Sequence, residues 1–164
     1  SYQDKIQICC VRPATVCGLS PRLRLDVSVN MLVYQAFRFG KINVLGGKQI
    51  RPNIHINDLV RIFNFFINKN FGKFIIVNAG FENISILDLA KKISKIIPTK
   101  ILVKKSNDPR SYRLDSTKIS KLGFKPKYGI NNAIIELYNF FKKNKYKDNL
   151  RNYNIKTMKK FSIK

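Results

Sequence analysis

The chain has 164 residues, 45% of them hydrophobic, so it is long enough to bury a sizeable core as one domain or as part of a larger one. It contains no apolar run of the roughly 20 residues that span a bilayer and no signal-peptide pattern, so we expect no membrane partner. The formal net charge of +23 suits an anionic partner such as nucleic acid. Lysine, isoleucine and asparagine are abundant together, however, and their codons are AT-rich, so a biased genome can produce such a charge without any anionic partner. We do not expect nucleic acid as the main partner.

The three cysteines, Cys9, Cys10 and Cys17, are an odd number and lack the spacing of metal ligands. Cys9 and Cys10 lie in an apolar run, where cysteine usually serves as a small buried hydrophobic residue. We therefore predict unpaired thiols, no metal site and a location in the reducing cytoplasm. The chain begins with Ser1 instead of methionine, and we interpret it as a fragment whose front is missing.

Strands and helices are predicted to alternate along the chain without an internal repeat. Short apolar runs bounded by turn residues indicate buried strands, and apolar positions at the 3.6-residue period indicate amphipathic helices. Asp26 is interpreted as a helix cap, Gly40 as the end of that helix, and Ser85 to Asp88 as a capping box. In chain order we predict a strand over 6–11, a helix over 27–39, strands over 42–45 and 51–56, a helix over 58–67, a strand over 74–78, a helix over 86–97, a strand over 100–104, and helices over 115–122 and 130–141. This alternation predicts an α/β fold.

No motif identifies an active site by itself. Neither Gly-x-Gly-x-x-Gly nor a Walker loop is present, and the pair Gly46-Gly47 is too short to cradle a pyrophosphate. The single histidine, His55, leaves no Ser/His/Asp set, and its place between two isoleucines indicates a structural role. The helix after it is expected to be capped by Asn57 or Asp58.

The segment around Arg51 is the most informative stretch of the chain. A glycine turn precedes Arg51, and Pro52 restricts the arginine to extended backbone geometry. An arginine fixed at the entrance of a strand is a planar, permanently charged fork that suits phosphate or carboxylate. The segment therefore predicts a contact between Arg51 and an anionic ligand.

Five short motifs follow one another over most of the chain, up to about Lys143. They are Arg12-Pro13-Ala14-Thr15-Val16-Cys17-Gly18, Arg24-Leu25-Asp26, the stretch from Arg51 to Asp58, Phe74-Ile75-Ile76-Val77-Asn78-Ala79-Gly80, and the stretch from Asp108 to Pro126. Each motif is weak alone, but in this order they resemble the second half of the extended short-chain dehydrogenase/reductase family. This family contains the NAD-dependent sugar-nucleotide epimerases and dehydratases.

The resemblance implies the last strands of a Rossmann-type parallel sheet plus a small C-terminal substrate-binding α/β domain. We place this portion at residues 1–143 and a basic, flexible tail at residues 144–164. In this family the first half of the chain holds NAD and a catalytic Tyr-Lys pair four residues apart. Tyr2 and Lys5 are three apart, so we expect no catalytic residue here, and NAD bound mainly by the missing half. The family further implies a nucleoside-diphosphate sugar as substrate and a homodimer of the full-length enzyme.

The resemblance also assigns residues to ligands. The implied contacts are Pro13 and Val16 with the nicotinamide ribose, Thr15 with the sugar or diphosphate, Arg24 and Asp26 in a loop that lines the substrate, and Arg51 and Arg110 with the diphosphate and nucleoside. Cys17 stands where the family usually has tyrosine, and Leu19 where proline is common. Both positions are at the edge of the implied sugar pocket, so the identity of the sugar stays open.

The leading hypothesis is the substrate-binding half of an NAD-dependent sugar-nucleotide epimerase or dehydratase, with a role in polysaccharide synthesis. This fragment alone is then expected to be inactive. One alternative is a non-catalytic basic protein that binds nucleotides or nucleic acid, and another is an inactive remnant of the enzyme. If the basic end only reflects genome composition, deletion of residues 147–164 leaves substrate affinity unchanged.

Overall fold

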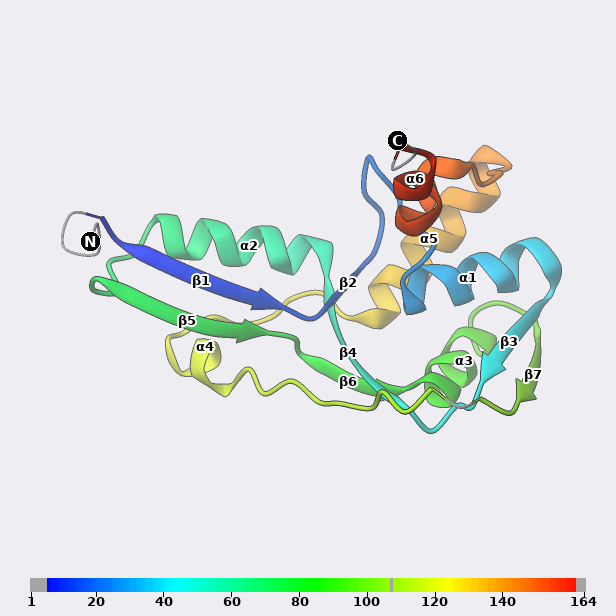
Figure 1. Ribbon diagram of the computed structural model, residues 1–164, viewed down its shortest axis with the longest axis horizontal. Coiled ribbons are helices and arrows are strands. Elements are labelled where there is room, and N and C mark those ends of the chain that lie inside the picture. Colours follow the sequence, from blue (N-terminus) through cyan, green and yellow to red (C-terminus); the bar gives the residue numbers. More distant parts are fainter. Residues whose placement is uncertain (1–5, 107, 162–164) are drawn as a thin grey trace.

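The computed structural model describes residues 6–106 and 108–161, and in this part of the chain strands and helices alternate. The elements are β1 (Ile8–Pro13), β2 (Thr15–Cys17), α1 (Ser28–Phe39), β3 (Lys41–Leu45), β4 (Ile50–His55), α2 (Ile56–Ile67), β5 (Phe74–Ala79), β6 (Glu82–Ser85), α3 (Ile86–Ser94), β7 (Lys100–Lys104), α4 (Thr117–Lys121), α5 (Ile130–Asn144), the 3-10 helix η1 (Leu150–Asn152) and α6 (Asn154–Phe161). Figure 1 shows β1, β5 and α2 at one end of the molecule, and α1, α3, β3 and β7 at the other. β4 and β6 run between the two ends.

Three small sheets carry the fold. β1 pairs in parallel with β5, and β3 pairs in parallel with β7. β4 lies between β2, to which it is parallel, and β6, to which it is antiparallel. Parallel strands need crossover connections, which here contain the intervening helices. The parallel pairs and their crossovers confirm the α/β class that the sequence predicted.

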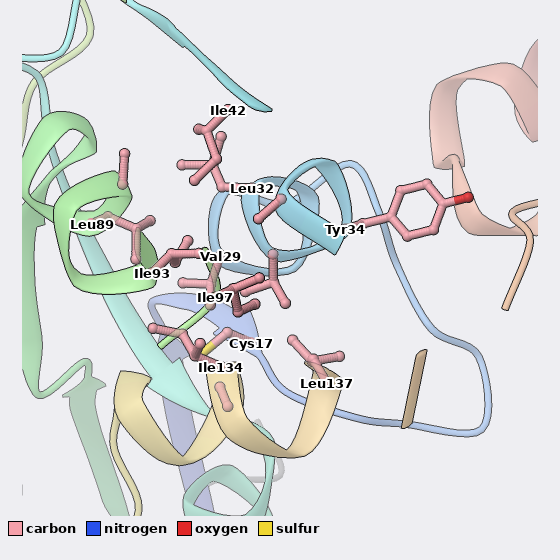
Figure 2. Close-up of a cluster of buried hydrophobic side chains, with 14 of the residues drawn as sticks. Cys17, Val29, Leu32, Tyr34, Ile42, Leu89, Ile93, Ile97, Ile134 and Leu137 are labelled. Carbon is pink, nitrogen blue, oxygen red and sulfur yellow. The ribbon is translucent and has the colours of Figure 1, made fainter. Parts of the chain in front are cut away.

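The larger hydrophobic core lies between α1, α3, α5 and β3, as Figure 2 shows. Val29 and Leu32 on α1 meet Leu89 on α3, and Ile134 and Leu137 on α5 lie in the same cluster, all fully buried. These residues recur at helical spacing, and each contributes about 1.5–3 kcal/mol through burial. The core fixes α1 and α5, the two helices whose side chains support the candidate site.

A second core holds α2 and α4 against β5. Ile62 on α2, Val77 on β5 and Ile119 on α4 are all fully or almost fully buried. Phe81 and Phe124 stack beside them, with ring centroids 5.7 Å apart. This smaller core joins the segment after β7 to the sheet formed by β1 and β5.

The start of α2 differs from the prediction. The N-cap is His55, whose Nδ1 accepts the backbone N–H of Asn57 over 3.1 Å. Asp58 is fully buried and accepts the backbone N–H groups of Lys127 and Tyr128, each over 2.9 Å. His55 therefore has a structural role, as predicted, while Asp58 anchors the segment before α5.

The sheet is open at β1, both along the free edge of the strand and at its side chains. Among the described residues β1 pairs with β5 alone, and both Cys9 and Cys10 are exposed. The prediction that these two cysteines are buried is wrong for this chain. Parallel strands are normally covered on both faces, and Phe63 and Phe74 are also about half exposed at this end of the molecule. This open surface is the kind that further strands and helices would cover.

The last part of the chain contains more regular structure than the sequence indicated. η1 and α6 follow α5, and neither was predicted, because lysines and asparagines dominate this segment. The division at residue 143 and the flexibility of residues 144–164 stay predictions. No helix in the described residues is long and apolar enough to cross a membrane.

Candidate functional site

A cleft of about 620 Å³ opens between β2, the loop at residues 18–26, the start of α2, and the segment at residues 110–112. It brings together six of the seven residues that the sequence assigned to ligands, although their positions span almost 100 residues. They are Thr15, Val16, Arg24, Asp26, Arg51 and Arg110. The seventh, Pro13, is the exposed last residue of β1 and does not line the cleft. The contacts of all seven with ligands stay predictions.

The wall of the cleft depends on a strand that the sequence did not show. β2 has only three residues, and the segment reads as loop because Gly18 follows so closely. Its Thr15 lies opposite Asn53 and its Val16 opposite Ile54 of β4. This pairing presents two of the predicted ligand residues side by side at the carboxyl end of a parallel strand, where ligands of α/β proteins usually bind.

Arg51 is held in place by its own chain. The turn at residues 46–47 has left-handed backbone angles, φ 76° and 100°, and leads directly into β4. The guanidinium donates to the Ile50 carbonyl over 3.1 Å, to the Arg110 carbonyl, and to Asp108 Oδ2 over 3.1 Å. Only 15% of the side chain is exposed. A guanidinium fixed in this way loses little further freedom when it binds an anion.

Asp108 joins the two arginines that were predicted to bind diphosphate. Its carboxylate accepts Nε of Arg110 over 2.8 Å and Nη2 of Arg110 over 2.9 Å, besides its contact with Arg51. Arg110, and to a smaller extent Arg51, hold the pKa of Asp108 well below its usual value. One carboxylate therefore neutralises only one of the two guanidinium charges. The two arginines together keep a net positive charge that a dianionic diphosphate can neutralise.

Arg24 and Asp26 form an ion pair on the 18–26 loop, with 2.9 Å between Nε and Oδ1. Asp26 Oδ2 also accepts the backbone N–H of Asn154 over 2.8 Å. Burial of this carboxylate raises its pKa, but Arg24 and the Asn154 N–H outweigh it, so the pKa of Asp26 is lowered. Asp26 is not the helix cap that the sequence predicted, because α1 begins after Val27. Its carboxylate is committed to the loop and the C-terminal segment.

Among the other lining residues, Arg22 and Tyr112 were not assigned to a ligand from the sequence, and Arg22 had only its position in its favour. Arg22 lines the same cleft, and its Nη2 donates to Asn154 Oδ1 over 2.8 Å. Tyr112 lies beside Arg51, whose guanidinium carbon is 5.8 Å from the ring centroid. Arg22 could have been found from its place two residues before Arg24, because alternate residues of an extended segment point the same way. No comparable pattern marks Tyr112.

Behind the cleft, His55 and Glu136 fix the backbone at residues 18 and 19. His55 Nε2 lies 3.1 Å from Glu136 Oε1, which also accepts the Leu19 N–H over 2.7 Å. Burial of Glu136 raises its pKa, but His55 and the Leu19 N–H outweigh it, so the pKa is lowered. Gly18 has φ +108°, and a Cβ there would lie 2.6 Å from Glu136 Oε1. Only glycine fits this approach without strain.

The side chains that line the cleft are rich in arginine. Burial, with smaller contributions from Glu82 and Glu136, raises the pKa of Cys17 to about 12, so its thiol is not a nucleophile at neutral pH. No group of three or more His, Cys, Asp or Glu side chains that could hold a metal ion occurs in the described part of the chain. Four arginines line the cleft and can bind and orient a phosphate-bearing ligand.

The sequence matches no protein-family model. Among solved structures, the chain matches dTDP-glucose 4,6-dehydratase from Bacillus anthracis in complex with NAD, with TM-score 0.72 and 17% identity over 88% of this chain and 48% of that chain. UDP-N-acetylglucosamine 4-epimerase from Bacillus cereus matches with TM-score 0.73 and 19% identity over 93% and 52%. UDP-glucuronic acid 4-epimerase from Bacillus cereus, in complex with UDP-glucuronic acid and NAD, matches with TM-score 0.69 and 27% identity over 85% and 46%.

These matches confirm the fold that the sequence resemblance implied. The chain has the α/β fold of the extended short-chain dehydrogenase/reductases, as found in solved sugar-nucleotide epimerases and dehydratases. It spans about half the length of the solved structures that it matches.

Proposed function

We propose that the chain is the substrate-binding half of an NAD-dependent nucleoside-diphosphate-sugar epimerase or dehydratase. The observation that carries this proposal is the convergence of Arg22, Arg24, Arg51 and Arg110 on one cleft, in a fold shared with solved sugar-nucleotide enzymes. A diphosphate carries two negative charges, and guanidinium forks bind it through paired hydrogen bonds. In this proposal Arg51 and Arg110 bind the diphosphate and nucleoside. The phosphate oxygens would replace Asp108 in part of its contacts with the two guanidinium groups.

The sugar would lie toward β2 and the 18–26 loop. Thr15 can donate and accept hydrogen bonds there, and the ion pair of Arg24 and Asp26 forms part of the same wall. Cys17 occupies the wall as a buried, neutral thiol. These residues would orient the sugar for reaction, and orientation of this kind lowers the entropic part of the barrier.

In the same proposal NAD is held mainly by the other half of the enzyme. The described residues contain no glycine-rich turn for a pyrophosphate, but Pro13 ends β1 beside Ala79, which ends β5. Pro13 is the last residue of β1 and Val16 lies in β2, the next strand along the chain, and both fit a contact with the nicotinamide ribose. NAD would supply the reversible hydride acceptor. The base would be a tyrosine of the other half, activated by its lysine, in a cytoplasmic homodimer.

The test is ligand binding by the full-length protein that contains this chain. UDP-glucose, UDP-glucuronic acid and dTDP-glucose would be titrated by calorimetry in the presence of NAD, and each would then be examined for turnover. We expect at least one of the three to bind and react. If none binds, and duplex DNA binds instead with an affinity that falls steeply with salt, the basic-protein alternative replaces this proposal.

A further inference from the structure

The C-terminal segment at residues 146–154 lies against the 18–26 loop, which forms one wall of the cleft. Figure 1 shows α6 beside this loop, although more than 120 residues separate them in the sequence. On the side of this segment the contacts are made by the backbone and side-chain groups of asparagines, and they do not involve Lys147, the one lysine at residues 146–154. These directional hydrogen bonds fix the segment at one place on the loop, which a positive net charge alone would not do.

Asn152 is the centre of these contacts. It is 4% exposed, and its Nδ2 donates to the Leu23 carbonyl over 2.7 Å and to the Tyr146 hydroxyl over 2.8 Å. Its backbone carbonyl accepts the Leu25 N–H over 2.8 Å. Oδ1 accepts the N–H of Asn149 over 2.8 Å, which closes η1. A single buried asparagine thus contacts two backbone groups of the loop. Only the contact with the Leu23 carbonyl depends on its side chain, so replacing that side chain would leave the carbonyl unpaired.

Asn154 extends the same contact to the residues that face the ligand. Its N–H donates to Asp26 Oδ2 over 2.8 Å, and its Oδ1 accepts from Arg22 over 2.8 Å. Asp26 in turn holds Arg24. Arg22, Arg24 and Asp26, three residues that line the cleft, are therefore held directly or through one partner by the C-terminal segment.

The opposite side of the loop is fixed by α1. Asn30 is buried, its Oδ1 accepts the Gly18 N–H over 3.0 Å, and its Nδ2 donates to the Arg24 carbonyl over 2.9 Å. The loop is thus held between Asn30, which belongs to a well-packed helix, and Asn152. Asn152 belongs to η1, which is followed by α6, a helix without any buried residue.

We propose that Asn152 is a positioning residue for substrate binding, because it clamps the 18–26 loop and so sets the placement of Arg22 and Arg24. The inference rests on the proposed function for its ligand, a nucleoside-diphosphate sugar. It also reverses the sequence-based expectation that residues 147–164 can be deleted without effect on substrate affinity. In this proposal the segment supports the loop that forms one wall of the cleft.

The decisive variant is Asn152→Asp in the full-length protein. This change keeps the size of the side chain and the Oδ1 acceptor for Asn149, but it removes the donor to the Leu23 carbonyl. Asn144→Asp is the matched control, because it makes the same change on an exposed side chain whose Nδ2 donates to Phe140 at the end of α5. A second variant, Asn154→Pro, removes only the N–H to Asp26 and the side-chain contact with Arg22. Proline suits the first position of α6, after the extended Tyr153.

Two measurements separate the clamp from the proposed function. Hydrogen exchange of the amides at residues 19–26 reports on the loop without any ligand, and titration with the best-bound of UDP-glucose, UDP-glucuronic acid and dTDP-glucose reports on affinity. We expect Asn152→Asp to speed exchange in the loop and to raise the Kd and KM about 3- to 10-fold, with kcat and the Kd for NAD near wild type. Asn154→Pro is expected to shift both measurements in the same direction, and Asn144→Asp to change neither.

The clamp is overturned if loop exchange and sugar-nucleotide affinity in Asn152→Asp match those of Asn144→Asp. It is also overturned if Asn152→Asp lowers kcat and NAD affinity together with the melting temperature, since that pattern marks general destabilisation. If Asn152→Asp does not fold, Asn154→Pro decides by the same criteria. If wild type binds none of the three sugar nucleotides, the proposed function fails, and loop exchange alone still decides whether Asn152 holds the loop.

Discussion

The guanidinium of Arg51 is fixed before a ligand arrives, since Ile50, Arg110 and Asp108 all accept its N–H groups. In the full-length enzyme we therefore expect Arg51→Ala to weaken sugar-nucleotide binding by about 1.5–3 kcal/mol, or about 10- to 150-fold in Kd. Arg51→Lys is expected to weaken binding less, because a lysine keeps the charge but cannot form a bidentate fork. Calorimetric titration measures both effects.

The matched control is Arg113→Ala, an exposed arginine in the same segment that does not line the cleft. It removes the same charge from the molecule, so it accounts for any long-range effect of net charge. NAD affinity and melting temperature should stay near wild type in all three variants. Equal sugar-nucleotide affinity in wild type and both Arg51 variants would show that Arg51 is a surface charge without a role in diphosphate binding.

Ionisation of Glu136 makes the stability of the folded chain depend on pH in the acidic range. Its folded-state pKa lies below the ordinary value of 4.5, because contacts with His55 and the Leu19 N–H outweigh burial. The stabilisation from the ionised carboxylate is therefore complete above pH 4.5 and is lost as the pH falls through the folded-state pKa. Glu136→Gln keeps an acceptor for Leu19 but cannot titrate. We expect the melting temperature of wild type to fall more steeply than that of Glu136→Gln from pH 5 to pH 3, as measured by calorimetry. Parallel curves would contradict this assignment.

At the scale of single residues, the sequence identified the arginines but not what holds them. Arg51 and Arg110 stand out because glycine, proline and motif order surround them. The contact of Asp108 with Arg51 and that of Asn152 with Leu23 do not show in the sequence, because the partners are 57 and 129 positions apart. Asp26 and Asp58 were interpreted as helix caps on local spacing, and both carboxylates instead accept N–H groups from distant segments. Long-range contacts of this kind leave no periodic signal.

At the scale of secondary-structure elements, every predicted helix and strand has a counterpart in the structure, with small differences at the ends. Hydrophobic periodicity was sufficient for these, because each presents an apolar face to one of the two cores. β2 and β6 were missed, since strands of three and four residues are too short to show alternation. α6 was missed for a different reason, because its apolar residues Ile155, Met158 and Phe161 are few, stand among lysines and are not buried.

β1 is the element with the most incomplete surroundings. In the isolated chain Cys9 and Cys10 are exposed while Cys17 is buried, with its pKa raised by burial to about 12. We expect iodoacetamide to modify Cys9 and Cys10 under native conditions and to modify Cys17 only after unfolding, as read by mass spectrometry. Cys17 also serves as the internal control for a folded chain.

In the full-length protein the same two cysteines should be protected, because further strands would cover β1. This comparison tests the position of the chain within a larger sheet independently of any ligand. Equal reactivity of Cys9 and Cys10 in the isolated chain and in the full-length protein would show that β1 is a true edge strand.

At the scale of the whole molecule, the chain contains all the arginines of the proposed anion-binding cleft but only two of the residues proposed to contact the cofactor. The four arginines, the 18–26 loop and the segment that clamps it all lie within the described residues. Pro13 and Val16 are the only residues assigned to NAD, and neither carries a charge that could hold a pyrophosphate. The fold matches about half of each solved sugar-nucleotide enzyme. We therefore expect this half to bind the sugar nucleotide and the other half to bind NAD.

The isolated chain should therefore neither retain NAD nor turn over a sugar nucleotide. Pyrophosphate binding in Rossmann folds needs a glycine-rich turn at a helix N-terminus, and the sequence contains no such motif. Calorimetry of the isolated chain with NAD is expected to show no stoichiometric binding, and incubation with UDP-glucuronic acid and NAD no hydride transfer. The open surface at β1 should also promote self-association, so light scattering is needed beside each titration. Stoichiometric NAD binding, or reduction of NAD by the purified chain, would show that the cofactor site lies in this half and would overturn the division of labour proposed here.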